Sequence, residues 1–418
     1  MTPGKPAYDS MDLSTLQYWA RSARERDEPL AVLRTERPVS WHPPAEGALM
    51  DDPNDLGYWA VVRHADVVAV SKAHEIFASS PEYGGVMFEN VPAELLQMTQ
   101  SILAMDEPQH GITRRLISAA FSPRQVRLIG EQIQSQATAI VDELIQHGPH
   151  DFVEQVSALL PLWTISEMLG VPASERGRMV RAVEDMVGWN DPEYIGDSDP
   201  ATLLMGGIAT LHDIAQKLVD ARRATPADDL MSALVTAEVS GNKLSDEELC
   251  SYFCLLAIAG NDTTRNTISH ALMALADNPD QKALLLSDFD KYIPTAIEEF
   301  LRWGSVVMTF RRTARADTEI AGQQIAAGDK VVMFYSSANR DESVFPDPWK
   351  FDLTRHPNPH VAFGGGGVHF CLGSHVARTQ MRALFGELLT RIPTLHVGHA
   401  EFVTGNFMNA VKRLPIAF

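Results

Sequence analysis

The stretch Phe363-Gly-Gly-Gly-Gly-Val-His-Phe-Cys371-Leu-Gly373 joins a run of glycines to a single cysteine, and the helical pattern of Ser374-His-Val-Ala-Arg378 follows it directly. The free backbone amides and the dipole at such a helix start favour a thiolate. Glycines let the backbone lie flat against a planar partner, because they lack a Cβ. The stretch therefore indicates a cysteine that binds a group held beside it.

Two other interpretations of this stretch stay open from the residues alone. An isolated cysteine is often a small buried apolar side chain. A glycine-rich loop before a helix can also bind phosphate, but no Gly-Lys-Ser/Thr follows these glycines and no clear strand precedes them. The ligand interpretation and the buried apolar interpretation of Cys371 are equally supported at this point.

Size and composition indicate a globular protein. The chain has 418 residues, of which 45% are hydrophobic and 21% charged, and it shows no Pro/Gly/Ser linker, repeat or low-complexity tract. We therefore predict a single domain over residues 1–418, whose core could enclose a sizeable cofactor. The formal net charge of −19 argues against nucleic acid or an anionic membrane surface as the main partner.

The N-terminus and the cysteines predict a cytoplasmic protein without a membrane anchor. The first 13 residues lack the apolar core of a signal peptide. The longest apolar runs, such as 254–260, are far shorter than the roughly 18 residues of a membrane span. Cys250, Cys254 and Cys371 cannot form a disulfide framework, as expected in a reducing compartment. We expect Cys250 and Cys254, four residues apart, to be buried apolar side chains.

Helical periodicity dominates the chain, so we predict a mainly α fold with a small β portion. The expected helices cover 12–28, 64–72, 107–120, 124–147, 154–169, 175–189, 201–223, 245–277, 290–303 and 374–391. The expected strands cover 58–62, 318–325 and 330–335. The segment 341–367 is irregular and rich in Pro, Asn, His and Gly. A loop of that length inside a compact domain is usually functional.

The predicted helix 245–277 would be about 50 Å long and would cross the whole domain. The pattern of Ser245 followed by Glu248 is typical of a capping box at its start. The residues 260–263, Gly-Asn-Asp-Thr, are poor in a helix interior. They predict a local opening of the helix, which is common at functional sites.

Four motifs in register resemble the cytochrome P-450 family over about 250–390. The glycine-rich cysteine stretch resembles its haem-binding loop, and Ala259-Gly-Asn-Asp-Thr-Thr264 resembles its oxygen-activation motif. Glu299-Phe-Leu-Arg302 resembles its Glu-x-x-Arg motif, and 345–355 resembles the segment whose arginine, here Arg355, completes that cluster. The segment 110–124 extends the match toward the N-terminus. The resemblance implies a helical P-450 fold that binds haem b.

By the same resemblance, Cys371 is the axial ligand of the haem iron, and the chain is a monooxygenase that hydroxylates a hydrophobic substrate with O2. Electrons would come from NAD(P)H through a ferredoxin reductase and a ferredoxin. The loop from Phe363 to Cys371 is one residue longer than in many bacterial members. That length, with 338–343, 358–360 and 263–266, resembles a mycobacterial branch that oxidises lipids at the chain end.

This branch resemblance implies terminal (omega) hydroxylation of methyl-branched lipids, fatty acids or isoprenoids. A sterol side-chain or terpenoid hydroxylase is an alternative on the same scaffold. A peroxide-driven enzyme or an isomerase would not need the Asp262–Thr263 pair. A non-enzymatic haem sensor is the alternative from another class, and it would not be expected to combine such a pair with an apolar pocket.

The resemblance also assigns roles to charged and polar residues. Asp262 and Thr263 would relay protons, although they could instead cap a broken helix. Glu299, Arg302 and Arg355 would form a buried ion cluster that fixes the cysteine loop without taking part in the chemistry. Residues expected to contact the haem, including its two carboxylates, are His110, Arg114, Arg312, His369, Phe363, Gly365 and Gly373, with Arg311 as a competitor for Arg312.

Substrate and partner contacts are the remaining expectations. The segment 79–98 corresponds to the family's lid over the pocket. The residues that we expect to contact substrate are Met87, Phe88, Val91, Leu95, Ala259, Val307, Met308, Phe310 and Phe407, all of which suit a hydrophobic ligand, although each could simply be core. An acidic ferredoxin could be attracted by Arg115, Arg124, Arg127, Arg378 and Arg382, each of which could equally be ordinary surface charge.

Overall fold

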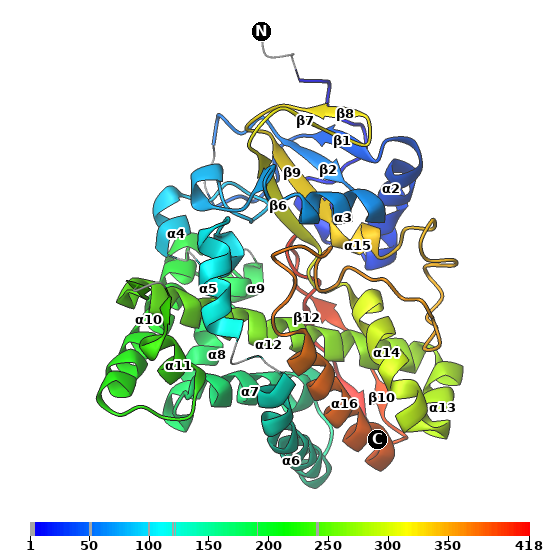
Figure 1. Cartoon of the computed structure of the whole chain (residues 1–418). Coiled ribbons are helices and arrows are strands. Elements are labelled where there is room, and N and C mark those ends of the chain that lie inside the picture. The colour runs from blue at the N-terminus through cyan, green and yellow to red at the C-terminus, as the bar shows by residue number, and fades with distance from the viewer. Residues whose placement is uncertain are drawn as a thin grey trace.

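The computed structural model describes residues 5–49, 52–98, 101–118, 121, 123–189, 191–239 and 242–418, except for the side chains of 123–128, 192, 239 and 242. A large helical part lies below a smaller part that contains the main sheet (Figure 1). The predicted fold class, mainly α with a small β portion, is confirmed. The helix predicted over 124–147 begins at Pro123, one residue earlier.

The helices carry most of the core. Their bounds are α1 Leu16–Trp19, α2 Ala23–Glu36, α3 His64–Lys72, α4 Ala93–Met98, α5 Gln109–Ser118, α6 Pro123–His147, α7 Leu159–Leu169, α8 Ala173–Val187, α9 Pro192–Ile195, α10 Pro200–Ala224, α11 Leu230–Thr236, α12 Asp246–Asp277, α13 Pro279–Ser287, α14 Phe289–Gly304, α15 Tyr335–Ala338 and α16 Ser374–Arg391. The largest hydrophobic cluster is built mainly from side chains of the helices between α5 and α16.

The main sheet has five strands in the order β1-β2-β9-β6-β3, and only the β2–β9 pair is parallel. Its strands are β1 Val39–His42, β2 Tyr58–Val61, β3 Phe77–Ala78, β6 Thr309–Ala314 and β9 Lys330–Phe334. Four two-stranded pairs complete the β portion: β4 Glu238–Val239 with β5 Asn242–Lys243, β7 Thr318–Ile320 with β8 Gln323–Ile325, β10 His396–Val397 with β13 Ile416–Ala417, and β11 Glu401–Phe402 with β12 Val411–Arg413.

Two predicted elements are wrong in their extent. The expected helix 12–28 is two helices, because Thr15 caps the start of α1 and Ser22 forms a capping box with Glu25 at the start of α2. The expected strand 318–325 is the hairpin β7–β8. Ala321 and Gly322 turn its chain with φ values of 50° and 85°.

Helix α12 runs through the middle of the helical part and packs against α7, α10 and α14 (Figure 1). The predicted capping box of Ser245 and Glu248 is present at its start. The predicted opening at 260–263 is wrong, since this fully described helix is continuous from Asp246 to Asp277. The Thr263 Oγ1 donates to the Ala259 carbonyl at 2.8 Å, so the side chain returns its hydrogen bond to the helix.

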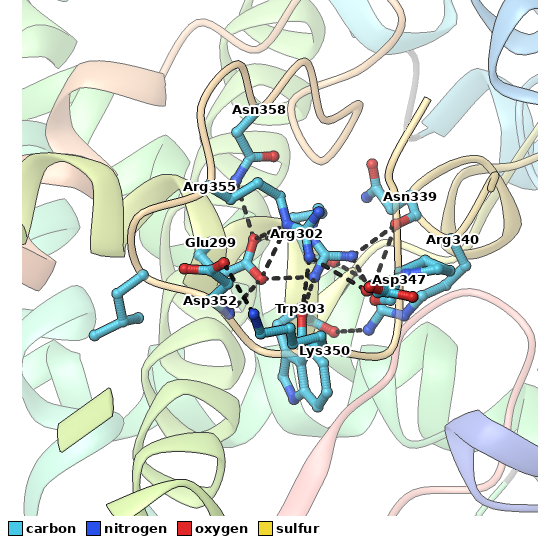
Figure 2. Close-up of polar contacts among 12 residues, drawn as sticks. Glu299, Arg302, Trp303, Asn339, Arg340, Asp347, Lys350, Asp352, Arg355 and Asn358 are labelled. Atoms are coloured by element: carbon cyan, nitrogen blue, oxygen red, sulfur yellow. Dashed lines mark hydrogen bonds and ion pairs between the residues drawn. The ribbon is translucent and has the colours of Figure 1, made fainter. Parts of the chain in front are cut away.

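A buried ion cluster ties α14 to the irregular segment 341–367 (Figure 2). Arg302 donates two hydrogen bonds to Glu299, at 2.8 and 2.7 Å, and both side chains are fully buried. Arg355 approaches Glu299 to 3.3 Å. The remaining Arg302 donors reach the backbone carbonyls of Asn339 and Pro348 at 3.0 and 2.8 Å.

Two amide groups link this cluster to the segment that leads into the cysteine loop. Asn358 Nδ2 donates to Glu299 at 3.1 Å, and the Val361 backbone amide donates to Asn339 Oδ1 at 2.8 Å. Because Val361 stands two residues before Phe363, the cluster fixes the start of the glycine run. This contact supports the predicted structural role of the three charged residues.

Among the described residues, no single helix combines the length and the apolar composition of a membrane span. One strongly bent pair, Val153–Leu169 with Ala173–Val187, reaches that length and composition only when its two helices are taken together.

We expect Arg302→Ala to destabilise the protein by about 3–5 kcal/mol, because it leaves Glu299 buried and charged without its main partner. As a control, Arg382→Ala removes an exposed ion pair with Asp290 and should cost about 0–1 kcal/mol. Thermal unfolding followed by circular dichroism compares the two. Equal shifts of the unfolding midpoint would contradict the structural role of the cluster.

Candidate active site

The cysteine loop lies against α3 and ends at the start of α16. The Cys371 amide donates to the Phe363 carbonyl at 3.0 Å, which closes the loop. Gly367 has a φ of 77°, and a Cβ there would meet the Ser71 carbonyl at 2.6 Å. A side chain at this position would therefore push the loop away from α3, so glycine is required for the close approach.

Cys371 faces a large internal cavity. Cys371 is half-buried, and desolvation by the surrounding protein raises the pKa of its thiol, while backbone amides of Gly373 and Ser374 and the charge of Arg114 oppose that rise. The described residues contain no group of three or more His, Cys, Asp or Glu side chains that could hold a metal ion. Within the described part of the chain, a metal bound by Cys371 therefore has to bring its other ligands with it, as the iron of haem does.

The cavity has a volume of about 490 Å³ and runs from the cysteine loop past α12 to the lid segment 79–98. Its wall is mainly apolar. The predicted residues that line it are Met87, Val91, Leu95, Ala259, Val307, Phe310 and Phe407, together with Phe363, Gly365 and Gly373 of the cysteine loop. A mostly apolar wall of this kind suits a hydrophobic ligand.

Two predicted substrate contacts need correction. Phe88 is 2% exposed and Met308 is 1% exposed, and both belong to a hydrophobic cluster on the sheet rather than to the cavity wall. The Phe88 ring packs edge-on against Tyr58 at a centroid distance of 4.6 Å. Their neighbours Met87 and Val307 line the wall instead.

Three cationic or basic side chains line the cavity near the cysteine loop: Arg114, Arg312 and His369. Arg114 donates to the Phe370 carbonyl at 2.5 Å, and Arg312 donates to the Arg311 carbonyl at 2.7 Å. Neither arginine forms an ion pair with a carboxylate of the described residues. A buried guanidinium group at Arg312 and a half-buried one at Arg114, neither with an acidic ion-pair partner, fit the two carboxylates that an enclosed haem would bring.

The two histidines of this group lie together. The rings of His110 and His369 are 4.4 Å apart, and burial, with the neighbouring charge of Arg312, lowers the pKa of His369 to about 2. His110 donates from Nδ1 to the Glu107 carboxylate at 3.0 Å, while its buried Nε2 has no partner among the described residues. His110 does not itself line the cavity, so it lies behind His369.

The structure distinguishes Arg312 from Arg311. Arg311 turns to the other side of β6, where it donates to Asn90 Oδ1 at 2.7 Å and to the Tyr83 carbonyl at 3.2 Å. It lines a separate polar pocket. Arg312 is therefore the arginine of β6 that reaches the cavity beside Cys371.

The predicted relay residues have different surroundings. Thr263 lines the cavity, whereas Asp262 is buried behind it. Burial raises the pKa of Asp262 to about 6, and the nearby Arg265 opposes the rise. Arg265 lies 3.4 Å from Asp262 and 3.7 Å from Glu184 of α8.

The chain Asp262–Arg265–Glu184 was not foreseen. Arg265 follows Asp262 by three residues, a spacing that places both on one face of a helix, so the sequence held that signal. Glu184 had no such signal in the sequence, because α8 and α12 come into contact only in the folded protein.

Two of the five predicted docking arginines are paired with carboxylates. Arg378 donates to both carboxylate oxygens of Glu298 at 2.6 and 2.8 Å, and Arg382 pairs with Asp290 at 2.5 Å. Arg115 is exposed. Arg124 and Arg127 have side chains outside the described residues. Cys250 and Cys254 are both buried, as expected of apolar side chains, and Cys254 also lines the cavity.

Comparison with known proteins places this geometry in a family. The family model described as cytochrome P-450 matches residues 205–394. A methyl-branched lipid omega-hydroxylase from Mycobacterium bovis is 39% identical over 100% of this chain and 96% of its own length. A steroid C26-monooxygenase from Mycolicibacterium smegmatis is 39% identical over 94% of this chain and 90% of its own length.

A solved structure is more similar still. The cytochrome P-450 of Mycobacterium marinum in complex with pseudoionone is 54% identical, covers 99% of this chain and 100% of its own, and superposes with a TM-score of 0.96. The cysteine loop, the arginines without acidic partners and the full-length relatives all indicate the same family. The chain belongs to the cytochrome P-450 family, whose members are oxidoreductases that bind haem b.

Proposed function

We propose that this cytochrome P-450 hydroxylates the terminal carbon of a methyl-branched lipid, fatty acid or isoprenoid, with O2 as the oxygen source. The observation that carries the proposal is the cavity itself. It reaches Cys371 on one side and Thr263 on the other, and its wall is otherwise mainly apolar. An elongated hydrophobic molecule can enter it and bring one end to the reactive centre.

The relatives support terminal oxidation. The names of the two curated relatives, an omega-hydroxylase of methyl-branched lipids and a steroid C26-monooxygenase, each state a hydrophobic substrate. The residue that lengthens the loop between Phe363 and Cys371 is a further feature of the branch that this chain resembles. A sterol side chain or a terpenoid remains the alternative substrate.

We assign the haem-binding roles by the chemistry of the side chains. Cys371 supplies the thiolate ligand, and Arg114, Arg312 and His369, with His110 behind it, hold the two haem carboxylates. Phe363, Gly365 and Gly373 shape the loop beside the ring. When bound, haem b supplies the iron chemistry that activates O2 and transfers one oxygen atom to a C–H bond. The protein places the substrate and excludes water from the site.

Thr263 and Asp262 manage protons in this proposal. Thr263 lines the cavity and its hydroxyl oxygen can accept a hydrogen bond from a water molecule there, while the hydroxyl itself donates to the Ala259 carbonyl. Asp262 has no direct contact with the cavity, so it acts through Thr263 or through water. With its pKa near 6, its carboxyl can both release and accept protons near neutral pH.

Electron delivery completes the proposal. A ferredoxin, reduced by an NAD(P)H-dependent reductase, would dock on the cysteine side of the molecule. Arg115 is an exposed member of the predicted set, and the pairing of Arg378 and Arg382 with carboxylates reduces what those two can offer an acidic partner. A cytoplasmic location belongs to the same proposal.

Replacing Cys371 tests the ligand assignment. We expect Cys371→Ser to abolish the long-wavelength Soret band of the reduced, CO-bound protein, because a serine oxygen does not supply the thiolate donor. The absorption spectrum and the haem content measure this, and Cys254→Ser is the control, since its thiol lies elsewhere in the cavity wall. A variant at 371 that retains the band would remove Cys371 from this role.

Replacing Thr263 tests the proton assignment. We expect Thr263→Ala to keep haem and substrate binding while more of the NAD(P)H consumed yields hydrogen peroxide instead of product. Thr263→Ser should restore coupling, because it retains the hydroxyl. The ratio of product to NAD(P)H measures the effect, and unchanged coupling in the alanine variant would refute the relay.

Product analysis tests the function as a whole. With ferredoxin, reductase, NAD(P)H and ¹⁸O2, a methyl-branched isoprenoid should yield the terminal alcohol carrying one labelled oxygen atom. Mass spectrometry and NMR identify the position. Hydroxylation confined to internal carbons would contradict the terminal assignment. Background NAD(P)H consumption with lipids, terpenoids and sterols alike would favour a haem sensor.

A further inference from the structure

The charged residues of the cavity wall are few and unevenly placed. Among the described residues that line it, Arg114 and Arg312 are the only arginines or lysines, and Glu89 is the only aspartate or glutamate. Both arginines lie with the cysteine loop and are assigned to the haem carboxylates. Glu89 belongs to the lid segment and forms no ion pair with a described lysine, arginine or histidine.

Glu89 is held by an amide from the opposite end of the chain. Asn406, in the turn before Phe407, donates from Nδ2 to Glu89 Oε1. Glu89 is 6% exposed and Asn406 is 5% exposed, and both line the cavity. Thr309 of β6 donates to the Asn406 carbonyl at 2.9 Å, which fixes the turn. The polar pair therefore belongs to a rigid part of the wall.

No described cation forms an ion pair with Glu89. The charge of Lys330 acts on it from a distance, and Lys330 itself forms an ion pair with Asp55 at 2.6 Å. Burial raises the pKa of the Glu89 carboxyl, and the Asn406 hydrogen bond opposes the rise. Asn406 has a second N–H and a carbonyl oxygen, and the described residues offer neither a partner. This spare hydrogen-bonding capacity is available to a ligand in the cavity.

Apolar aromatic groups adjoin the pair. Phe407 directly follows Asn406, and its ring lies 5.5 Å from that of Phe310. Both rings line the cavity. A ligand whose oxygen function meets Glu89 and Asn406 would thus place its hydrocarbon part against aromatic and aliphatic side chains.

We propose that Glu89 and Asn406 form a subsite for a neutral oxygen function of the substrate, a hydroxyl or a ketone carbonyl, and that they select against a free carboxylate. The inference rests on the proposed function and narrows its substrate class to neutral oxygenated lipids. In a substrate that is hydroxylated at its terminal carbon, the existing oxygen function and the reacting methyl group lie at opposite ends of the molecule. The oxygen function can therefore contact Glu89 and Asn406 while the methyl group lies near Cys371 and Thr263.

The selection follows from hydrogen bonding and charge. A hydroxyl can donate to the Glu89 carboxylate and accept from the free N–H of Asn406, and a ketone can accept from the same N–H. A carboxylate brings a second negative charge beside Glu89, which has no ion-pair partner among the described residues. Such like-charge repulsion is a common way for a binding site to exclude a competitor.

The experiment measures spectral dissociation constants for an alcohol, a ketone and a carboxylic acid with the same methyl-branched isoprenoid chain. The wild-type holoenzyme should bind the alcohol and the ketone about tenfold or more tightly than the acid. Glu89→Gln keeps the size of the side chain and removes its charge, so we expect it to bring the acid to within a few-fold of the alcohol. The Soret band of the CO-bound form verifies that each variant is folded.

Glu82→Gln is the matched control, because it removes one negative charge from the same lid segment at an exposed residue outside the cavity wall. It should leave the acid-to-alcohol ratio unchanged. Equal binding of acid and alcohol by the wild type, or the same ratio in Glu89→Gln as in the wild type, would overturn the subsite while leaving the proposed function intact. No Soret shift with any of the three compounds would overturn both.

Discussion

A thiolate buried in an apolar chamber is the constraint on which the rest of this structure depends. Burial alone favours the neutral thiol of Cys371. A thiolate is therefore stable there only when it binds a cation. Backbone amides of Gly373 and Ser374 and the charge of Arg114 act in the same direction as that cation. The loop backbone provides these amides because α16 begins directly after it.

The surrounding scaffold keeps this loop in place from two sides. On one side the loop presses against α3, where glycine is the only residue that fits at 367. On the other side the Glu299–Arg302–Arg355 cluster fixes the segment that leads into it, through Asn339 and Asn358 (Figure 2). Buried ion clusters of this kind contribute little net stability, but they specify one geometry because every member needs its partner.

Charge divides the cavity into two regions with different tasks. Guanidinium groups without acidic partners lie beside the cysteine loop and suit the carboxylates of the cofactor. The one described carboxyl of the wall, Glu89, lies in the lid with an amide partner and no cation. Hydrophobic side chains make up most of the remaining wall, so the positions of a few polar groups determine how a substrate is oriented.

The sequence by itself determined the family, the fold class, the cysteine and the cluster of Glu299 and Arg302. Those features depend on local spacing: a glycine run before a helix, an i,i+3 pair and a capping box can all be recognised along the chain. It also placed Met87, Phe310 and Phe407 near the substrate region.

Only the tertiary structure decided the features that join distant segments. The sequence could not tell that Phe88 and Met308 pack in the hydrophobic cluster at the sheet while Met87 and Val307 line the cavity, because that division arises from packing between distant segments. It could not choose between Arg311 and Arg312, because neighbouring side chains of a strand point to opposite faces. The contacts of Glu184 with Arg265, and of Glu89 with Asn406, join residues 81 and 317 positions apart, and such contacts arise only when the packing of helices and sheet brings them together.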